Sequence, residues 1–176
     1  AGELSQGNAV ADTFSLLEGG GAATDMKVIA VGSGSQRMNF TTRAAHVGRA
    51  TASGMITRAV MRDEATAIIN GITKIEKGAR KADGQQTERV LMLSPRARGD
   101  ANPILLIDED DVKAGHAASV GQVNAEHLYY LMSRGIPREE AERLIIYGFL
   151  APVVGEIPLP SLRERLGRLI ERKLGQ

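Results

Sequence analysis

The sequence predicts a mainly β protein, with a solenoid of parallel strands over residues 1–122 and a small α-helical domain over residues 123–176. From about residue 9 to residue 122 the chain is a succession of short aliphatic or β-branched runs, interrupted by Gly, Asn and Asp. Aromatic residues are rare in this part, since only Phe14 and Phe40 precede Tyr129. After residue 122 the spacing of apolar residues becomes helical.

The strand pattern is clearest before Gly32, where residues 25–31 form one run, and over residues 55–62. In the second segment one face of an extended chain suits a continuous core, and it carries Met55, Thr57, Ala59 and Met61. The opposite face, which we expect outside that core, carries Ile56, Arg58, Val60 and Arg62. Residues 65–75 repeat the pattern with smaller side chains. Narrow aliphatic layers favour stacked solenoid coils, although the irregular spacing of the turns leaves a β-sandwich open.

Three helices are expected after residue 122. Asn124 can cap the first, which Gly135 ends, and Pro137 begins a second helix that we expect to end before Pro152. Ser161 is the expected cap of a third helix, whose apolar stripe consists of Leu162, Leu166, Leu169, Ile170 and Leu174. This stripe indicates either an amphipathic helix with a solvated face or a docking surface for another protein.

Composition excludes several classes of function. The chain has 22 basic and 21 acidic residues, a net charge of +1 and no Cys, so its own residues provide neither a thiolate metal site nor a disulfide. It has no apolar run long enough to span a membrane and no signal peptide, and its cations are not clustered. We therefore expect a cytoplasmic protein with no membrane span and no nucleic-acid partner. Because the chain lacks an initiator Met, it is expected to be a fragment.

Few side chains suggest chemistry. Residues 108–111 form an acidic run without the ligand spacing of a calcium loop, so we expect a solvated turn. Among the three histidines, we expect His127 on the surface and His46 partly buried with its hydrogen bonds satisfied. His116 has only small neighbours, Ala114-Gly115 and Ala117-Ala118, which leaves its imidazole open to a ligand or a facing subunit.

Several short motifs occur together in a specific order. They are Ala79-Arg80-Lys81-Ala82-Asp83-Gly84-Gln85-Gln86, Leu91-Met92-Leu93-Ser94, Asp110-Asp111-Val112-Lys113, Gly115-His116-Ala117-Ala118, and Ser133-Arg134-Gly135-Ile136 followed by Glu139-Glu140-Ala141. With these motifs the stretch from His46 to Leu150 resembles the SufB/SufD family of iron–sulfur cluster assembly scaffolds. The chain is similar to the C-terminal part of a longer member, most like SufD.

The resemblance implies a right-handed parallel β-helix followed by a small helical domain. It also implies a scaffold rather than an enzyme, pairing through its β-helix with a SufB-like subunit or with a second copy. The C-terminal helices would bind the ABC-type ATPase SufC, to which ATP hydrolysis would belong. No cofactor is expected to bind stably, although a transient iron–sulfur cluster at the partner interface is compatible with the resemblance.

Within the family, two features favour SufD over SufB: Ala117 follows His116 where SufB typically has Glu, and the chain has no Cys. The resemblance makes His116 a candidate cluster-assembly residue and metal ligand at the SufB interface. Ala114 stands where the family usually has a Cys, so thiolate ligands would have to come from the partner. The residues expected to bind SufC are Tyr129, Tyr130, Arg134, Gly135 and Phe149.

Two other classes of function remain as alternatives. One is a component of an ABC transporter, which an ATPase partner would suit but the missing membrane spans oppose. The other is a β-solenoid enzyme acting on polysaccharide, which would need clustered carboxylates and stacking aromatic residues along a groove.

Overall fold

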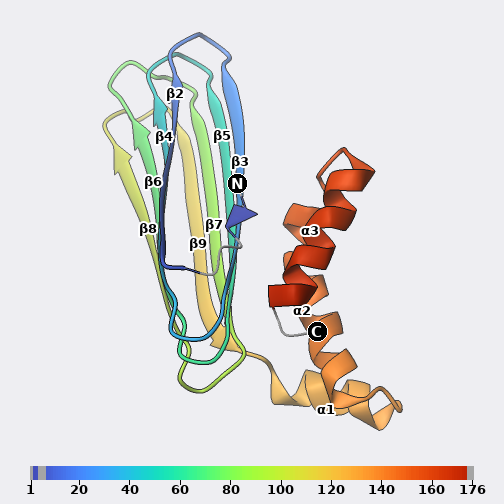
Figure 1. The fold of residues 1–176 in the computed structure, drawn as a ribbon. Coiled ribbons are helices and arrows are strands. Elements are labelled where there is room, and N and C mark those ends of the chain that lie inside the picture. The colour runs from blue at the N-terminus through green and yellow to red at the C-terminus, as the bar shows by residue number, and fades with distance from the viewer. Residues whose placement is uncertain (1, 4–6, 174–176) are drawn as a thin grey trace.

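Two parallel sheets face each other in the computed structural model, which describes residues 2–3 and 7–173 (Figure 1). The larger sheet has the order β1 (Gly2–Glu3), β3 (Ala23–Gly32), β5 (Ala52–Met61), β7 (Asp83–Met92) and β9 (Lys113–Gln122). The smaller has the order β2 (Ala9–Leu17), β4 (Arg37–His46), β6 (Thr66–Ile75) and β8 (Arg98–Ile107). Every strand from β1 to β7 pairs in parallel with the strand two places later in the chain. The chain therefore winds between the sheets as a parallel β-solenoid, which confirms the predicted fold and excludes a β-sandwich.

The register of the larger sheet places similar residues on top of one another. Ala30 pairs with Ala59, which pairs with Val90, and all three side chains are buried. Because paired residues of parallel strands point to the same face, one side of each strand lines the interior. The expected core face of residues 55–62 is confirmed, since it is fully buried there. The apolar interior consists of Val28, Ala30, Met38, Phe40, Ala59, Met61, Ala65, Ala67, Ile69, Val90 and Ala97.

The outer face of β5 differs from the prediction, because Val60 and Arg58 are also buried. Helices α2 (Arg138–Val154) and α3 (Pro160–Lys173) lie beside the larger sheet and contact β3, with α2 also contacting β5 (Figure 1). A second apolar cluster forms between them from Ile29, Val31, Val60, Ile146, Leu150, Val153 and Ile170. The alternation of residues within one strand could not predict that helices cover its outer face, since the helix residues that pack there lie more than 80 positions later in the sequence.

Helix α1 (Ala125–Ser133) begins and ends where the sequence predicts. The Asn124 side chain accepts hydrogen bonds from the backbone N–H groups of Glu126 at 2.7 Å and His127 at 3.4 Å. Gly135 follows the helix with φ +86°, a conformation that glycine adopts without a steric penalty.

Two expected helix boundaries were wrong. Helix α2 continues through Pro152 to Val154, since Val153 in its last turn packs beside Leu150 in the apolar cluster against the sheet. A proline this close to a helix C-terminus removes only one backbone hydrogen bond, so the packing outweighs the loss. Helix α3 begins at Pro160, which suits a first helical position, so Ser161 is inside the helix instead of capping it. Leu174, the last residue of the predicted stripe, lies outside the described residues. No helix in residues 7–173 has the length and apolarity needed to cross a membrane.

Candidate functional site at the open end of the solenoid

Strands β8 and β9 form the last coil, and each pairs on one side only within the described residues. The residues of β9 from His116 to Gln122 are all exposed. The free edge of such a strand presents a row of unpaired backbone N–H and C=O groups, which can pair with another chain. This end of the solenoid is therefore the place where a second sheet could be added.

His116 lies in the middle of this last coil. It pairs with Gln86 of β7, whose side chain is buried in the interior. Because paired side chains share a face, His116 is on the interior side of β9, at the open mouth of the solenoid. Its neighbours on that face are Ala114 and Ala118. The exposed imidazole is thus accessible from the mouth, in agreement with the expectation that it is sterically open.

Beneath His116 the interior is polar. Gln86 accepts a hydrogen bond from the Thr73 hydroxyl at 3.0 Å and donates a long one of 3.5 Å to the Ile104 carbonyl. Glu88, two residues further along β7, is only 2% exposed, and its Oε2 has no hydrogen-bond partner among the described residues. Burial raises the pKa of Glu88 to about 7. Gly71 on the facing strand provides the room, since a Cβ there would lie 1.8 Å from Glu88 Oε1.

His46 belongs to a second, fully satisfied polar group. Its Nδ1 lies 2.8 Å from Thr51 Oγ1 and its Nε2 lies 2.8 Å from Ser53 Oγ. The ring is completely buried, more deeply than the sequence suggested, and this burial lowers its pKa. With both ring nitrogens occupied, His46 is a structural residue. His127 is exposed, as predicted.

The acidic run forms the turn that leads into β9. Its Glu109 is buried and accepts a backbone hydrogen bond from Gly78 of the preceding turn at 2.9 Å, which lowers the pKa of Glu109. Lys81 of the preceding turn donates its backbone N–H to the Asp111 carbonyl at 2.6 Å. The turn is therefore anchored to the coil below and presents β9 in a fixed position.

The donor set at the mouth is small. Within the part of the chain that the structure describes, no three His, Cys, Asp or Glu side chains are grouped closely enough to hold a metal ion. The chain has no Cys. His116 can therefore offer one imidazole to a metal, and a stable site would need further ligands from another chain.

Four of the residues expected to bind a partner lie together around the end of α1. Tyr129 is 73% exposed and Tyr130 is 57% exposed, and the Arg134 guanidinium lies 5.1 Å from the centre of the Tyr130 ring. Gly135 follows directly. Phe149 is separate from this group, because it lies on α2, is half-buried and faces Arg58 of β5 at 5.4 Å.

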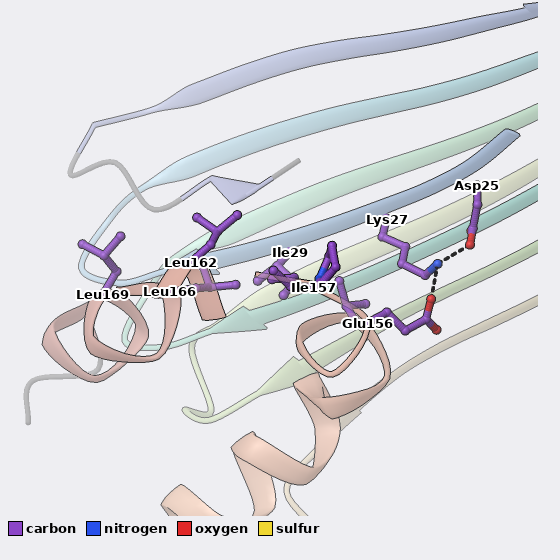
Figure 2. Close-up of a pocket in the computed structure, with 10 residues that line it drawn as sticks. Asp25, Lys27, Ile29, Glu156, Ile157, Leu162, Leu166 and Leu169 are labelled. Carbon is purple, nitrogen blue, oxygen red and sulfur yellow. Dashed lines mark hydrogen bonds and ion pairs between the residues drawn. The ribbon is translucent and has the colours of Figure 1, made fainter. Parts of the chain in front are cut away.

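A groove of about 730 Å³ lies between β3 and α3 (Figure 2). Leu162, Leu166 and Leu169 of α3 line it opposite Ile29. At one end the Lys27 ammonium donates hydrogen bonds to the carboxylates of Asp25 and Glu156, and these bonds, the one to Asp25 first, raise the pKa of Lys27. The apolar stripe predicted for the third helix thus packs on the sheet through Leu166 and Ile170, while Leu162 stays partly exposed.

Sequence reasoning did not single out Gln86, Glu88 or Arg58 as site residues. Over residues 84–88 both faces of β7 are polar or carry no side chain, so hydropathy does not identify the interior face. The only available signal was that Gln86 belongs to one of the motifs. The register with β9 then places it next to His116.

Comparison with known proteins agrees with this architecture. The family described as "SUF system FeS cluster assembly, SufBD core domain" matches residues 1–149. The chain is 56% identical over 173 residues to the iron–sulfur cluster assembly protein SufD of Bacillus subtilis, covering 98% of this chain and 40% of that protein. It is 34% identical over 122 residues to SufD of Escherichia coli, covering 69% of this chain and 29% of that protein.

A SufBD family protein of Mycobacterium leprae is 32% identical over 139 residues, which are 79% of this chain and 16% of that protein. The chain thus spans less than half the length of these relatives. Its parallel solenoid, its motifs and the match over residues 1–149 together show that the chain belongs to the SufB/SufD family of iron–sulfur cluster assembly proteins and resembles the C-terminal part of SufD.

Proposed function

We propose that this chain is part of a SufD-like scaffold subunit of the SUF machinery, without catalytic activity of its own. In this proposal it pairs with a SufB-like subunit through the open end of the solenoid and binds the SufC ATPase through its helices. The observation that carries the proposal is the position of His116, exposed at the mouth of the solenoid on a strand with a free edge.

The free edges of β8 and β9 support the pairing. A partner strand added at either edge would satisfy the unpaired backbone groups and extend the sheet. Apolar side chains are also exposed on these two strands, namely Ile104, Leu106, Ile107 and Val120. A second solenoid, from a SufB-like subunit or from another copy of this chain, would cover them.

The chemistry of the mouth supports a role in cluster assembly. The cluster would be the cargo of the complex, built between the subunits. His116 would offer an imidazole nitrogen to iron or transfer a proton beside a thiolate of the partner. Since this chain has no Cys, all thiolates at such a site would belong to the partner.

The test is His116→Ala in a complex reconstituted from the full-length protein and its SufB-like and SufC-type partners. The variant should fold normally, because the His116 ring is exposed at the last strand of the solenoid. We expect co-purification to be retained and iron and sulfide bound per complex to fall severalfold. The matched control is His127→Ala, an exposed histidine on α1 outside the solenoid strands. Unchanged cluster assembly in His116→Ala would contradict the role of this imidazole, and failure of the wild-type chain to co-purify would contradict the pairing.

A further inference from the structure

Arg58 is the most unusual charged residue on the outer face of the larger sheet. It is only 7% exposed, and its Nε and Nη1 have no hydrogen-bond partner among the described residues. A buried guanidinium normally has a carboxylate or several hydrogen-bond acceptors around it, because losing its water without replacement is costly. Here Arg58 pairs in register with Ile29 of β3, and the face of the Phe149 ring of α2 lies 5.4 Å from its guanidinium.

A second guanidinium lies beside it instead of a counter-ion. Arg58 pairs in register with Arg89 of β7, so their side chains leave the same face of the sheet one strand apart. Burial first, and then the charge of Arg89, lower the pKa of Arg58. Neither arginine forms an ion pair in residues 7–173.

Lys27 on the same face gives the contrast. Ile29 of β3 pairs in register with Arg58, and Lys27 lies two positions before Ile29 in the same strand. The Lys27 ammonium contacts the carboxylates of both Asp25 and Glu156. Two carboxylates therefore contact one cation of this face, whereas among the described residues no carboxylate forms an ion pair with either of the two arginines.

The pair can be reached from solvent on the Arg89 side. Arg89 is exposed, and the next residue in the row is Ser119 of β9, which is also exposed. Helix α2 contacts β3 and β5, so it covers the Arg58 side of the row. An anion arriving over β7 would meet Arg89 first and lie one strand from Arg58.

We propose that Arg58 and Arg89 form a binding site for an oxyanion, either a phosphate-type anion or a carboxylate. Guanidinium groups present several N–H donors in a plane and bind such groups through two oxygens at once. The anion would contact the exposed Arg89 directly and would lie beside the buried Arg58 guanidinium, whose charge it would also offset. The site does not depend on the cluster-assembly role of His116.

The experiment is thermal unfolding of the chain at one fixed pH in sodium phosphate, sodium acetate or sodium chloride at matched ionic strength. We expect phosphate, acetate or both to raise the midpoint saturably relative to chloride, by about 3–5 °C at ten times the dissociation constant. A response to phosphate alone would identify a phosphate-type ligand, and a comparable response to acetate would identify a carboxylate, such as an acidic side chain of a partner.

The variant Arg58→Met removes the buried charge and keeps much of the volume. Without added anion its midpoint should equal or exceed that of the wild type, because an unpaired buried charge is lost, and its response to the anion should disappear. Arg89→Gln, at an exposed position, should keep the fold and weaken the response. Arg37→Gln, an exposed arginine at the start of β4, is the control and should respond like the wild type. The proposal is overturned if neither anion acts differently from chloride, if Arg58→Met keeps the response, or if Arg58→Met lowers the midpoint without anion, which would make the guanidinium a structural support for α2.

Discussion

Glu88 is a carboxyl group that the fold keeps out of water, and its Oε2 has no hydrogen-bond partner among the described residues. Its side chain crosses the interior from β7 to the space left by Gly71 on β6. A charged carboxylate is poorly solvated there, so the native state holds the proton to a higher pH than the unfolded chain does. This gives the stability of the protein a specific dependence on pH.

The variant Glu88→Gln should remove that dependence. The pKa of Glu88 is about 7 in the folded protein against a model-peptide value of 4.5. Between these two values the unfolded state has lost the proton and the native state keeps it, so the free energy of unfolding falls as pH rises through the window and is level above it. The total loss is about 3 kcal/mol. Glu88→Gln should therefore be more stable than the wild type above pH 7 by an amount of that order, as measured by urea denaturation across the window.

His46 must be separated from this effect. Because burial lowers its pKa from 6.5, the folded protein also loses stability as pH falls below 6.5. That contribution is common to both proteins, so the difference between Glu88→Gln and the wild type isolates Glu88. A difference that stays constant from below pH 4.5 to above pH 7 would show that the Glu88 carboxyl is solvated in the folded state.

At the scale of elements, helices α1 and α2 carry aromatic residues in different environments. Tyr130 on α1 is exposed and contacts Arg134 of the same helix end. Phe149 on α2 packs against the apolar cluster between the helices and the sheet. The two residues were expected to share a role in SufC binding, and the structure places one toward solvent and the other toward the sheet.

Substitution to Ala should therefore separate binding from stability. Tyr130→Ala should leave the thermal midpoint within about 1 °C of the wild type and, in the proposed complex, weaken SufC binding by roughly tenfold, as is typical of a central aromatic contact. Phe149→Ala should lower the free energy of unfolding by roughly 1–3 kcal/mol, because it empties part of the cluster and removes the ring that faces the Arg58 guanidinium. Circular dichroism melts and a binding titration with SufC measure both. Full-strength SufC binding by Tyr130→Ala would contradict a contact at the end of α1.

At the scale of the whole molecule, the solenoid is a one-dimensional stack. Each coil contacts only the coils next to it, so each coil is stabilised by its interfaces with its neighbours. The coils at the ends have one such interface and should unfold locally at the lowest free energy. Strands β5 and β7 each pair on both sides, and β5 is also covered by α2. Strand β9 pairs on one side and is exposed over most of its length.

Backbone hydrogen exchange should be slowest in the strands that pair on both sides and fastest in the strands at the open end. We expect backbone amides of β5 to exchange at least roughly tenfold more slowly than those of β9. Adding a SufB-like partner should slow exchange in β8 and β9 and leave β5 unchanged. Uniform exchange along the stack would indicate that the solenoid opens as one unit, and partner-induced protection located elsewhere would contradict pairing through the open end.

The sequence by itself determined the elements whose signals are local. Asn124 and Gly135 bound α1, since capping depends on a few adjacent backbone groups, and the alternation of residues 55–61 identifies the interior face, since the side chains of a strand alternate by geometry. The motif containing His116 indicated the family and an exposed residue at the mouth.

Only the tertiary structure decided what depends on distant segments. Whether α2 continues through Pro152 depends on the packing of Val153 against the sheet. The burial of Arg58 depends on a helix about 90 residues later in the chain. Likewise, Glu88 becomes a group with a pKa of about 7 only because Gly71 and the coils around it exclude water. The residues of a segment and its immediate neighbours set its backbone conformation. The solvent exposure and protonation of its side chains depend on the segments that pack against it, which lie far away in the sequence.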